Sequence, residues 1–257
     1  MPSNSNTRVN RYGALAAEVY DIDKPYFTLP DTRYHLDRLA EVDGPILEPA
    51  CGSGRTLVPL LDAGHVAAGF DASPDMLERC RAKCAARGHA PDLSQQLFED
   101  FRYAETFAAI LVPVGTFTLI DDVQTALAVL RRFRSHLRPG GRLALDLPSL
   151  GTMANVSDDR RSWTAENGDL LTVHGQRVVT DWVAQRVQWR TRYERWRDNV
   201  LVETQLEPMS QRLWGLEEMR LALTATGFAD ITFVGDYDRT RAPRASDHTL
   251  TVEAVRA

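Results

Sequence analysis

Apolar strands and amphipathic helices alternate along residues 45–150, and this order most restricts what the chain can fold into. The expected strands cover residues 46–48, 66–70, 93–98, 107–112 and 142–147, and the expected helices between them cover 55–61, 76–87 and 123–137. Strands joined through helices pair in parallel, and the helices then cover both faces of the sheet. We therefore predict an α/β fold with a doubly wound, mostly parallel sheet.

The pattern changes after Pro148. From about Trp163 to Trp214 polar and apolar residues alternate, and Asn167-Gly168 and Asp198-Asn199 are typical turns, so an antiparallel sheet is expected. Residues before 45 combine helical stretches with tyrosines, and a helix followed by two strands ends the chain. The predicted segments are an N-terminal helical cap (1–44), the core (45–150), an inserted antiparallel sheet (151–214) and the C-terminal part of the core (215–257).

The composition argues against several classes of protein. The formal net charge of −5 disfavours nucleic-acid binding, and no run of about 18 apolar residues is present to span a membrane. Three cysteines cannot form a disulfide framework, so we expect a cytoplasmic protein. Cys80 and Cys84 have the spacing of two metal ligands on a helix, but no second pair completes a set, and no metal site is expected.

The most informative stretch is Ile46 to Gly54. An acidic residue, Glu48, ends a strand, a Gly-x-Gly turn follows, and a helix begins. Such a turn brings backbone N–H groups close to a ligand without side-chain interference. Asp71 ends the next strand, 19 residues after Gly52, where a carboxylate can accept the hydroxyls of a ribose. A nucleoside-containing ligand is therefore expected at this edge of the sheet.

Two nucleoside ligands compete for this turn. A dinucleotide requires a third glycine, because its pyrophosphate needs close packing of the helix, and Leu57 occupies that position. S-adenosylmethionine has no phosphate, and its ammonium group suits Glu48. The turn therefore favours S-adenosylmethionine over NAD.

Four segments resemble those of class I S-adenosylmethionine-dependent methyltransferases. Residues 48–54 resemble the E/D-x-x-x-G-x-G signature, and residues 69–77 resemble the form G-x-D-x-S-x-x-M-L. Glu99-Asp100-Phe101 is similar to the segment beside the adenine, and residues 137–141 are similar to an L-x-P-G-G turn. They occur in the family's order and spacing, so the chain is identified as a member, in the small-molecule branch with an inserted antiparallel sheet. The resemblance implies a Rossmann-like core.

The resemblance also implies a cofactor site. Asp71 would bind the ribose, Asp100 and the Phe101 amide would contact the adenine, and an N-terminal helix with two tyrosines would cap the cofactor. The turn after Val112 would hold the methionyl end. The complete set is Tyr12, Tyr20, Glu48, Ala50, Gly52, Gly54, Asp71, Ala72, Met76, Asp100, Phe101, Val112 and Thr116.

The acceptor is expected to be a small molecule that is methylated at N or O. The inserted sheet resembles the roof of natural-product and amino-sugar N-methyltransferases, and its five tryptophans are candidates for an apolar cage. The histidine that amino-sugar enzymes carry after strand four is absent here, which argues against an amino sugar. The candidate catalytic residues are His174, Asp146 and Tyr20.

Two other functions remain open. Relatives with this fold also use S-adenosylmethionine in cyclisation or lyase reactions, and a cofactor-binding chain can serve as a non-catalytic partner. The tryptophan-bearing sheet leaves a homodimer open as well.

Overall fold

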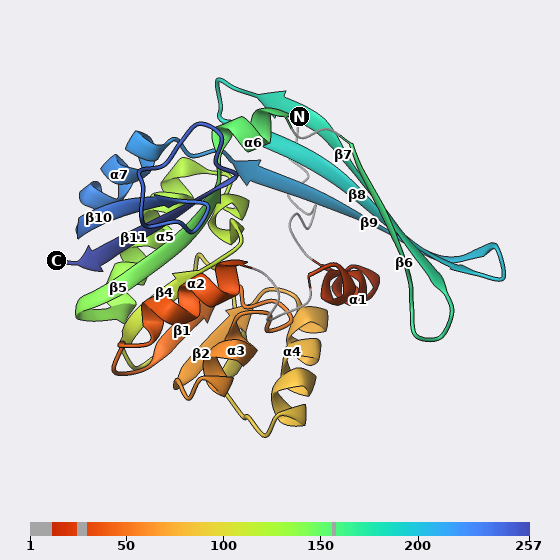
Figure 1. Cartoon of the computed structure of the whole chain (residues 1–257), viewed down its shortest axis with the longest axis horizontal. Coiled ribbons are helices and arrows are strands. Elements are labelled where there is room, and N and C mark those ends of the chain that lie inside the picture. Colours follow the sequence, from red (N-terminus) through yellow and green to blue (C-terminus); the bar gives the residue numbers. More distant parts are fainter. Residues whose placement is uncertain (1–11, 25–29, 156–157) are drawn as a thin grey trace.

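The computed structural model describes residues 12–24, 30–155 and 158–257, and they form two sheets (Figure 1). The first sheet has seven strands in the order β10-β11-β5-β4-β1-β2-β3. Its strands are β1 (Ile46–Pro49), β2 (Ala67–Asp71), β3 (Leu93–Gln95), β4 (Phe107–Val112), β5 (Leu137–Pro148), β10 (Phe228–Gly235) and β11 (Thr249–Arg256). Strands β1 to β5 are parallel, and β11 runs antiparallel to both of its neighbours, β5 and β10. The predicted doubly wound sheet is confirmed.

Helices cover both faces of this sheet because its central strands are apolar on both sides. Strand β4 is buried along its whole length. Its Ala109 and Leu111 pack with α3 (Leu57–Asp62) and α4 (Pro74–Ala86), whereas Ile110 and Val112 pack with α5 (Val123–His136) and α7 (Leu216–Ala225). Alternate residues of β4 therefore belong to two different hydrophobic cores, one on each face of the sheet.

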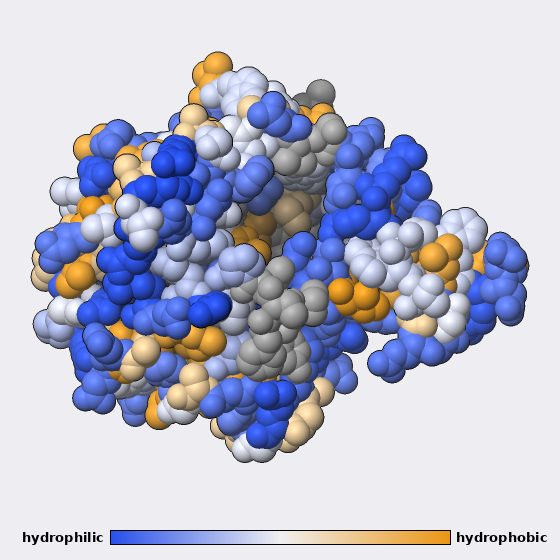
Figure 2. Space-filling view, viewed as in Figure 1, coloured by the Kyte–Doolittle hydropathy of each residue, from blue (hydrophilic) through white to orange (hydrophobic). Residues whose placement is uncertain are grey.

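The second sheet is antiparallel, in the order β6-β7-β8-β9, as predicted. Its strands are β6 (Asp159–Thr164), β7 (Leu170–Asp181), β8 (Arg186–Arg197) and β9 (Val200–Arg212). The turns contain left-handed residues, Gly168 in one and Asp198 and Asn199 in the other, at the positions expected. The sheet arches over the core in Figure 1, and its far end projects from the body in the space-filling view (Figure 2).

Helix α1 (Ala14–Asp23) lies between the arch and the core. Its Leu15 and Val19 pack against Leu171 and Tyr193 of the second sheet. Two side chains of β9 cap the helix, because Gln205 accepts from the N–H of Leu15 and Glu207 from that of Gly13. The remaining helices are α2 (Pro30–Leu39), α6 (Leu150–Asn155) and the short 3₁₀ helix η1 (Thr116–Leu119).

Several expected details differ from the structure. The strand expected to reach residue 98 ends at Gln95, and Arg55 and Thr56 precede α3. Residues 137–141 lie within β5, although Gly140 has the positive φ of a turn. Residues 1–11 and 25–29 of the expected cap lie outside the described residues. In the described part of the chain, every helix is too short or too polar to span a bilayer.

The tryptophans do not form the cage that the sequence suggested. Trp214 is buried in the main core against Phe117, at 5.9 Å between ring centroids, and Trp182 is 52% exposed. Trp163 packs against the apolar cluster that α1 forms with the second sheet. The indole N–H of Trp196 donates to the hydroxyl of Thr172. Trp189 lines a cavity beside the second sheet.

Two leucines of α7 test the packing of the core. Leu223 is fully buried against the sheet, whereas Leu221 is 69% exposed. Leu223→Ala should lower the free energy of unfolding by about 2–5 kcal/mol, since it removes buried methyl groups and leaves a cavity. Leu221→Ala on the same helix should change it by less than about 0.5 kcal/mol. Denaturant unfolding of both variants measures this difference, and equal effects would contradict the described packing.

Candidate functional site

The turn after β1 has a backbone that most side chains would disfavour. Ala50, Gly52 and Gly54 all have positive φ, at 52°, 56° and 85°. At Gly54 a Cβ atom would lie 2.8 Å from the sulfur of Cys80, so glycine is required there for packing as well as conformation. This glycine turn begins at the carboxyl end of β1, where ligands bind in open α/β sheets.

Asp71, at the end of β2, is fixed against this turn. One carboxylate oxygen accepts the N–H of Gly52 at 2.9 Å, and the other accepts the N–H of Ser73 at 2.8 Å. Burial raises the pKa of Asp71, and these two amides act in the opposite direction. A carboxylate has about four acceptor positions. Asp71 is therefore oriented by the backbone and keeps acceptor capacity for two ligand hydroxyls.

Glu48 is the second carboxylate at the turn. It is 3% exposed, and its Oε2 has no hydrogen-bond partner among the described residues. Burial raises the pKa of Glu48 well above its ordinary value, while the Arg55 guanidinium lowers it. A buried oxygen without a donor costs free energy, so such groups point to a missing ligand. The ammonium group of S-adenosylmethionine is a donor of the required charge, and the residues at the turn fit that cofactor.

A guanidinium that the sequence analysis missed joins the turn to the cap. Arg55 pairs through both terminal nitrogens with Asp31 of α2, with Nη1 at 3.1 Å from Oδ1, and all of this pair is buried. The positive charge of Arg55 also opposes the increase in the pKa of Tyr20 that burial causes. No local pattern marks Arg55 or Asp31, because they pair across the fold.

Some of the residues expected at the adenine lie close together. Ala72 and Asp100 line one shallow cavity of about 360 Å³ together with Gln95. Met76 is buried, and its sulfur lies 4.0 Å from the position of a Cβ atom on Gly52. The Phe101 ring stacks on Phe70 in the core, at 4.9 Å between centroids.

The Phe101 amide already has an acceptor, since it donates to the carbonyl of Leu97 at 3.0 Å. The Phe101 amide could donate to the adenine only after its hydrogen bond to Leu97 is broken. This role of Phe101 therefore stays a prediction.

The tyrosines of the cap lie above the glycine turn. The carbonyl of Tyr12 accepts from the hydroxyl of Ser73 at 2.5 Å, which ties the start of α1 to the residues after β2. The rings of Tyr12 and Tyr20 meet edge to face, at 5.8 Å between centroids. The structure thus brings both tyrosines, Asp71 and Glu48 into one region.

A cavity of about 250 Å³ lies between α1 and the second sheet. Four aromatic rings line it, from Tyr12, Tyr20, Trp189 and Tyr193. The charged residues of its lining are Asp23, Lys24, Asp159 and Arg161, and Arg161 pairs with both aspartates. The cavity is therefore apolar on its walls and charged at one side, which suits a small molecule with a polar group.

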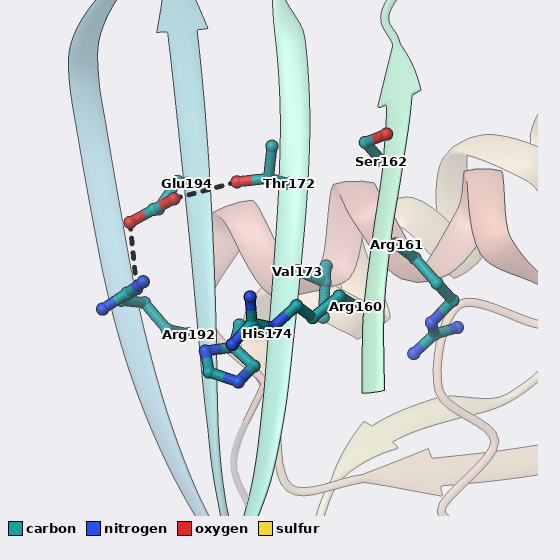
Figure 3. A pocket seen from close by; sticks show the side chains of 8 residues that line it. All are labelled: Arg160, Arg161, Ser162, Thr172, Val173, His174, Arg192 and Glu194. Carbon is teal, nitrogen blue, oxygen red and sulfur yellow. Dashed lines mark hydrogen bonds and ion pairs between the residues drawn. The ribbon is translucent and has the colours of Figure 1, made fainter. Parts of the chain in front are cut away.

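The structure separates His174 from this cavity. Successive residues of a strand face opposite sides, and Val173 faces α1, so His174 lies on the outer face of the sheet. There it lines a depression of about 540 Å³ beside Arg160 and Arg192 (Figure 3). Its nearest carboxylate is Asp158, at 3.5 Å. The catalytic role of His174 stays a prediction that this placement does not support.

Asp146 lies at the carboxyl end of β5 and is completely buried. It pairs with His35 of α2 at 2.9 Å and accepts the hydroxyl of Thr251 at 2.7 Å. Burial by itself raises the pKa of a carboxyl group, but His35, Thr251 and the N–H of Val114 hold that of Asp146 below its ordinary value. The sequence analysis singled out Asp146 but not His35.

Comparison with known families identifies the core. The model of a methyltransferase domain family matches residues 46–141, which include the glycine turn, Asp71, Asp100 and Val112.

Two curated relatives match parts of the chain. The cypemycin N-terminal methyltransferase of a Streptomyces species is 30% identical over 122 residues, which are 46% of this chain and 48% of that protein. The ubiquinone biosynthesis O-methyltransferase of Xanthomonas axonopodis is 26% identical over 144 residues, 54% of this chain and 59% of that protein. The chain thus spans about half the length of the curated relatives it matches.

Two solved structures resemble the whole chain. A S-adenosylmethionine-dependent methyltransferase of Clostridium acetobutylicum aligns with a TM-score of 0.79 at 16% identity, over 94% of this chain and 97% of that one. A sugar N-methyltransferase of a Streptoalloteichus species aligns with a TM-score of 0.70 at 20% identity, over 88% and 85%. At these low sequence identities, the structural similarity shows a shared fold and nothing more.

Asp71 offers a direct test of the cofactor site. Asp71→Asn keeps the shape of the side chain but replaces one acceptor oxygen with a donor. The affinity for S-adenosylmethionine should fall roughly 100-fold, which corresponds to about 3 kcal/mol for hydrogen bonds to a charged group. Calorimetric titration measures this change. Glu78→Ala, an exposed residue of α4, is the control and should bind as the wild type does. Unchanged affinity in Asp71→Asn would place the cofactor elsewhere.

Proposed function

We propose that this chain, whose residues 46–141 match a methyltransferase domain family, is a class I S-adenosylmethionine-dependent methyltransferase that transfers a methyl group to the nitrogen of a small-molecule amine. The observation that carries the proposal is the pair of carboxylates at the glycine turn, one oriented for hydroxyls and one lacking a donor. The acceptor would occupy the cavity under the second sheet, which borders the same tyrosines.

Methyl transfer depends more on the alignment of the reacting atoms and the exclusion of water than on acid–base groups. When bound, the cofactor supplies a methyl group on a positively charged sulfur, which leaves as a neutral thioether while the new N–C bond forms. Tyr12 and Tyr20 lie between the glycine turn and the cavity, so they would shield the reacting atoms from water. Their ring faces also suit a cationic sulfur.

The residues around the cavity favour nitrogen over oxygen as the acceptor atom. Burial raises the pKa values of Tyr12, Tyr20 and Tyr193, so these hydroxyls remain neutral and do not take up a proton. Asp23 is paired with Arg161 and Lys24, which lower its pKa although burial acts in the opposite direction. Among the described residues that line the cavity there is no histidine. An amine can lose its proton to water before transfer, whereas an alcohol requires a base in the site.

The names of the relatives agree with this proposal at the level of chemical class. The cypemycin enzyme is named for methylation of an N-terminus, and a structure of similar fold is that of a sugar N-methyltransferase. Both names describe amine acceptors. The ubiquinone biosynthesis enzyme is named as an O-methyltransferase, so the choice between N and O is the point to test.

The decisive experiment supplies S-adenosylmethionine with a labelled methyl group and two matched pairs of acceptors, benzylamine with benzyl alcohol and cyclohexylamine with cyclohexanol. We expect label in the amines only. The rate at limiting acceptor should rise with pH as the amine loses its proton, and the midpoint should follow the pKa of the amine used. A midpoint that stays fixed for amines of different basicity would reveal a base on the protein and contradict the proposal.

Other outcomes point to the two alternative functions. Release of methylthioadenosine without an acceptor would indicate a cyclase or lyase. Tight binding of S-adenosylmethionine with no transfer to any acceptor would indicate a non-catalytic partner. Both outcomes would overturn the proposal of methyl transfer.

A further inference from the structure

The turn after β4 contains an unusual backbone. Val114 has a φ of 62°, in the left-handed region, and Gly115 follows with a φ of 72°. The left-handed region is natural for glycine but disfavoured for a β-branched residue. Such a conformation persists only where its surroundings hold it, and these positions are often functional.

Asp146 is the group that holds Val114. The N–H of Val114 donates to Oδ2 of Asp146 at 3.0 Å. The same oxygen accepts from Nε2 of His35 at 2.9 Å and from the hydroxyl of Tyr237 at 3.3 Å, and Oδ1 accepts from Thr251 at 2.7 Å. One donor comes from the turn and one from α2. The third lies in the segment that follows β10, and the fourth lies in β11. These four hydrogen bonds commit the Asp146 carboxylate to groups of the protein itself.

The turn connects Asp146 to the cavity under the second sheet. The carbonyl of Gly115 accepts both the N–H and the hydroxyl of Thr118 in η1, at 3.0 and 2.7 Å. The oxygen of that hydroxyl accepts from Nε2 of Gln211 at 3.1 Å, and Gln211 lines the cavity. A shift of the turn would therefore move one wall of the cavity.

We propose that Asp146, paired with His35, is a positioning residue for methyl transfer, which fixes the left-handed Val114 turn and, through η1 and Gln211, the wall of the acceptor cavity. This inference rests on the proposed function. The charge of Asp146 is essential to it because only an ionised carboxylate accepts from all four donors at once. An amide in the same place is uncharged and has one acceptor oxygen instead of two, so it holds Val114 and His35 less tightly and the strained turn can then relax.

The test combines a variant that should lose activity with a second substitution that should restore it. Asp146→Asn should lower kcat with an amine acceptor about 10-fold or more. Val114→Gly alone is the reference for the double variant. The double variant should regain kcat to within about 3-fold of that reference, because glycine adopts the turn without help from Asp146. An effect of Asp146→Asn that glycine does not rescue would overturn the positioning role.

A matched variant distinguishes a loss of positioning from a loss of folding. Thr251→Val removes the donor on Oδ1 and leaves the Val114 contact in place, so kcat should stay within about 3-fold of wild type. A loss as large as that of Asp146→Asn, in a protein that unfolds at the wild-type temperature, would show that the effect does not pass through Val114 and would overturn the inference.

Amide hydrogen exchange separates this inference from the proposed function. Exchange over residues 113–119 should be faster in Asp146→Asn than in wild type and should be unaffected by Thr251→Val. This readout needs no turnover. A wild-type protein that methylates no amine would count against the proposed function alone, whereas unchanged exchange in Asp146→Asn would count against the positioning role alone.

Discussion

Helix α1 joins the two sheets, and the rest of the site depends on that junction. Its apolar side packs on the second sheet, while Asp21 on its other side pairs with Arg79 and Lys83 of α4. Arg195 of β8 adds an ion pair to Glu18 at 2.6 Å. Partly exposed ion pairs of this kind contribute about 0–1 kcal/mol each, so packing of the apolar side contributes more. The result is that Tyr12 and Tyr20 lie over the glycine turn and also line the cavity.

Three buried or half-buried carboxylates lie at the carboxyl edge of the parallel strands, and their partners distinguish their roles. Asp146 accepts four donors and is fully satisfied within the protein. Asp71 accepts two backbone amides and retains capacity for a ligand. Glu48 has an oxygen with no donor among the described residues. The unused acceptor capacity, more than the presence of the carboxylate, indicates where a ligand binds.

The fold and the cofactor edge could be predicted because their signals are local. Apolar runs alternating with helices determine a parallel sheet, and Gly52, Gly54 and Asp71 stand at fixed positions relative to the strand ends. The acceptor side was harder to predict. A period of two shows that Val173 and His174 face opposite sides, but only the docking of α1 decides which side encloses the cavity. The pairs Arg55–Asp31 and His35–Asp146 join distant segments, so no local pattern reveals them.

The proposed acceptor site lies between α1 and the inner face of the second sheet. Two tryptophans of that sheet provide the most direct measurement, since Trp189 lines the cavity and Trp182 is exposed. With the best amine acceptor, Trp189→Ala should raise the KM of the amine about 10-fold and leave the Kd of S-adenosylmethionine unchanged, while Trp182→Ala should change neither. An unchanged KM in Trp189→Ala, or equal effects of the two substitutions, would contradict the account.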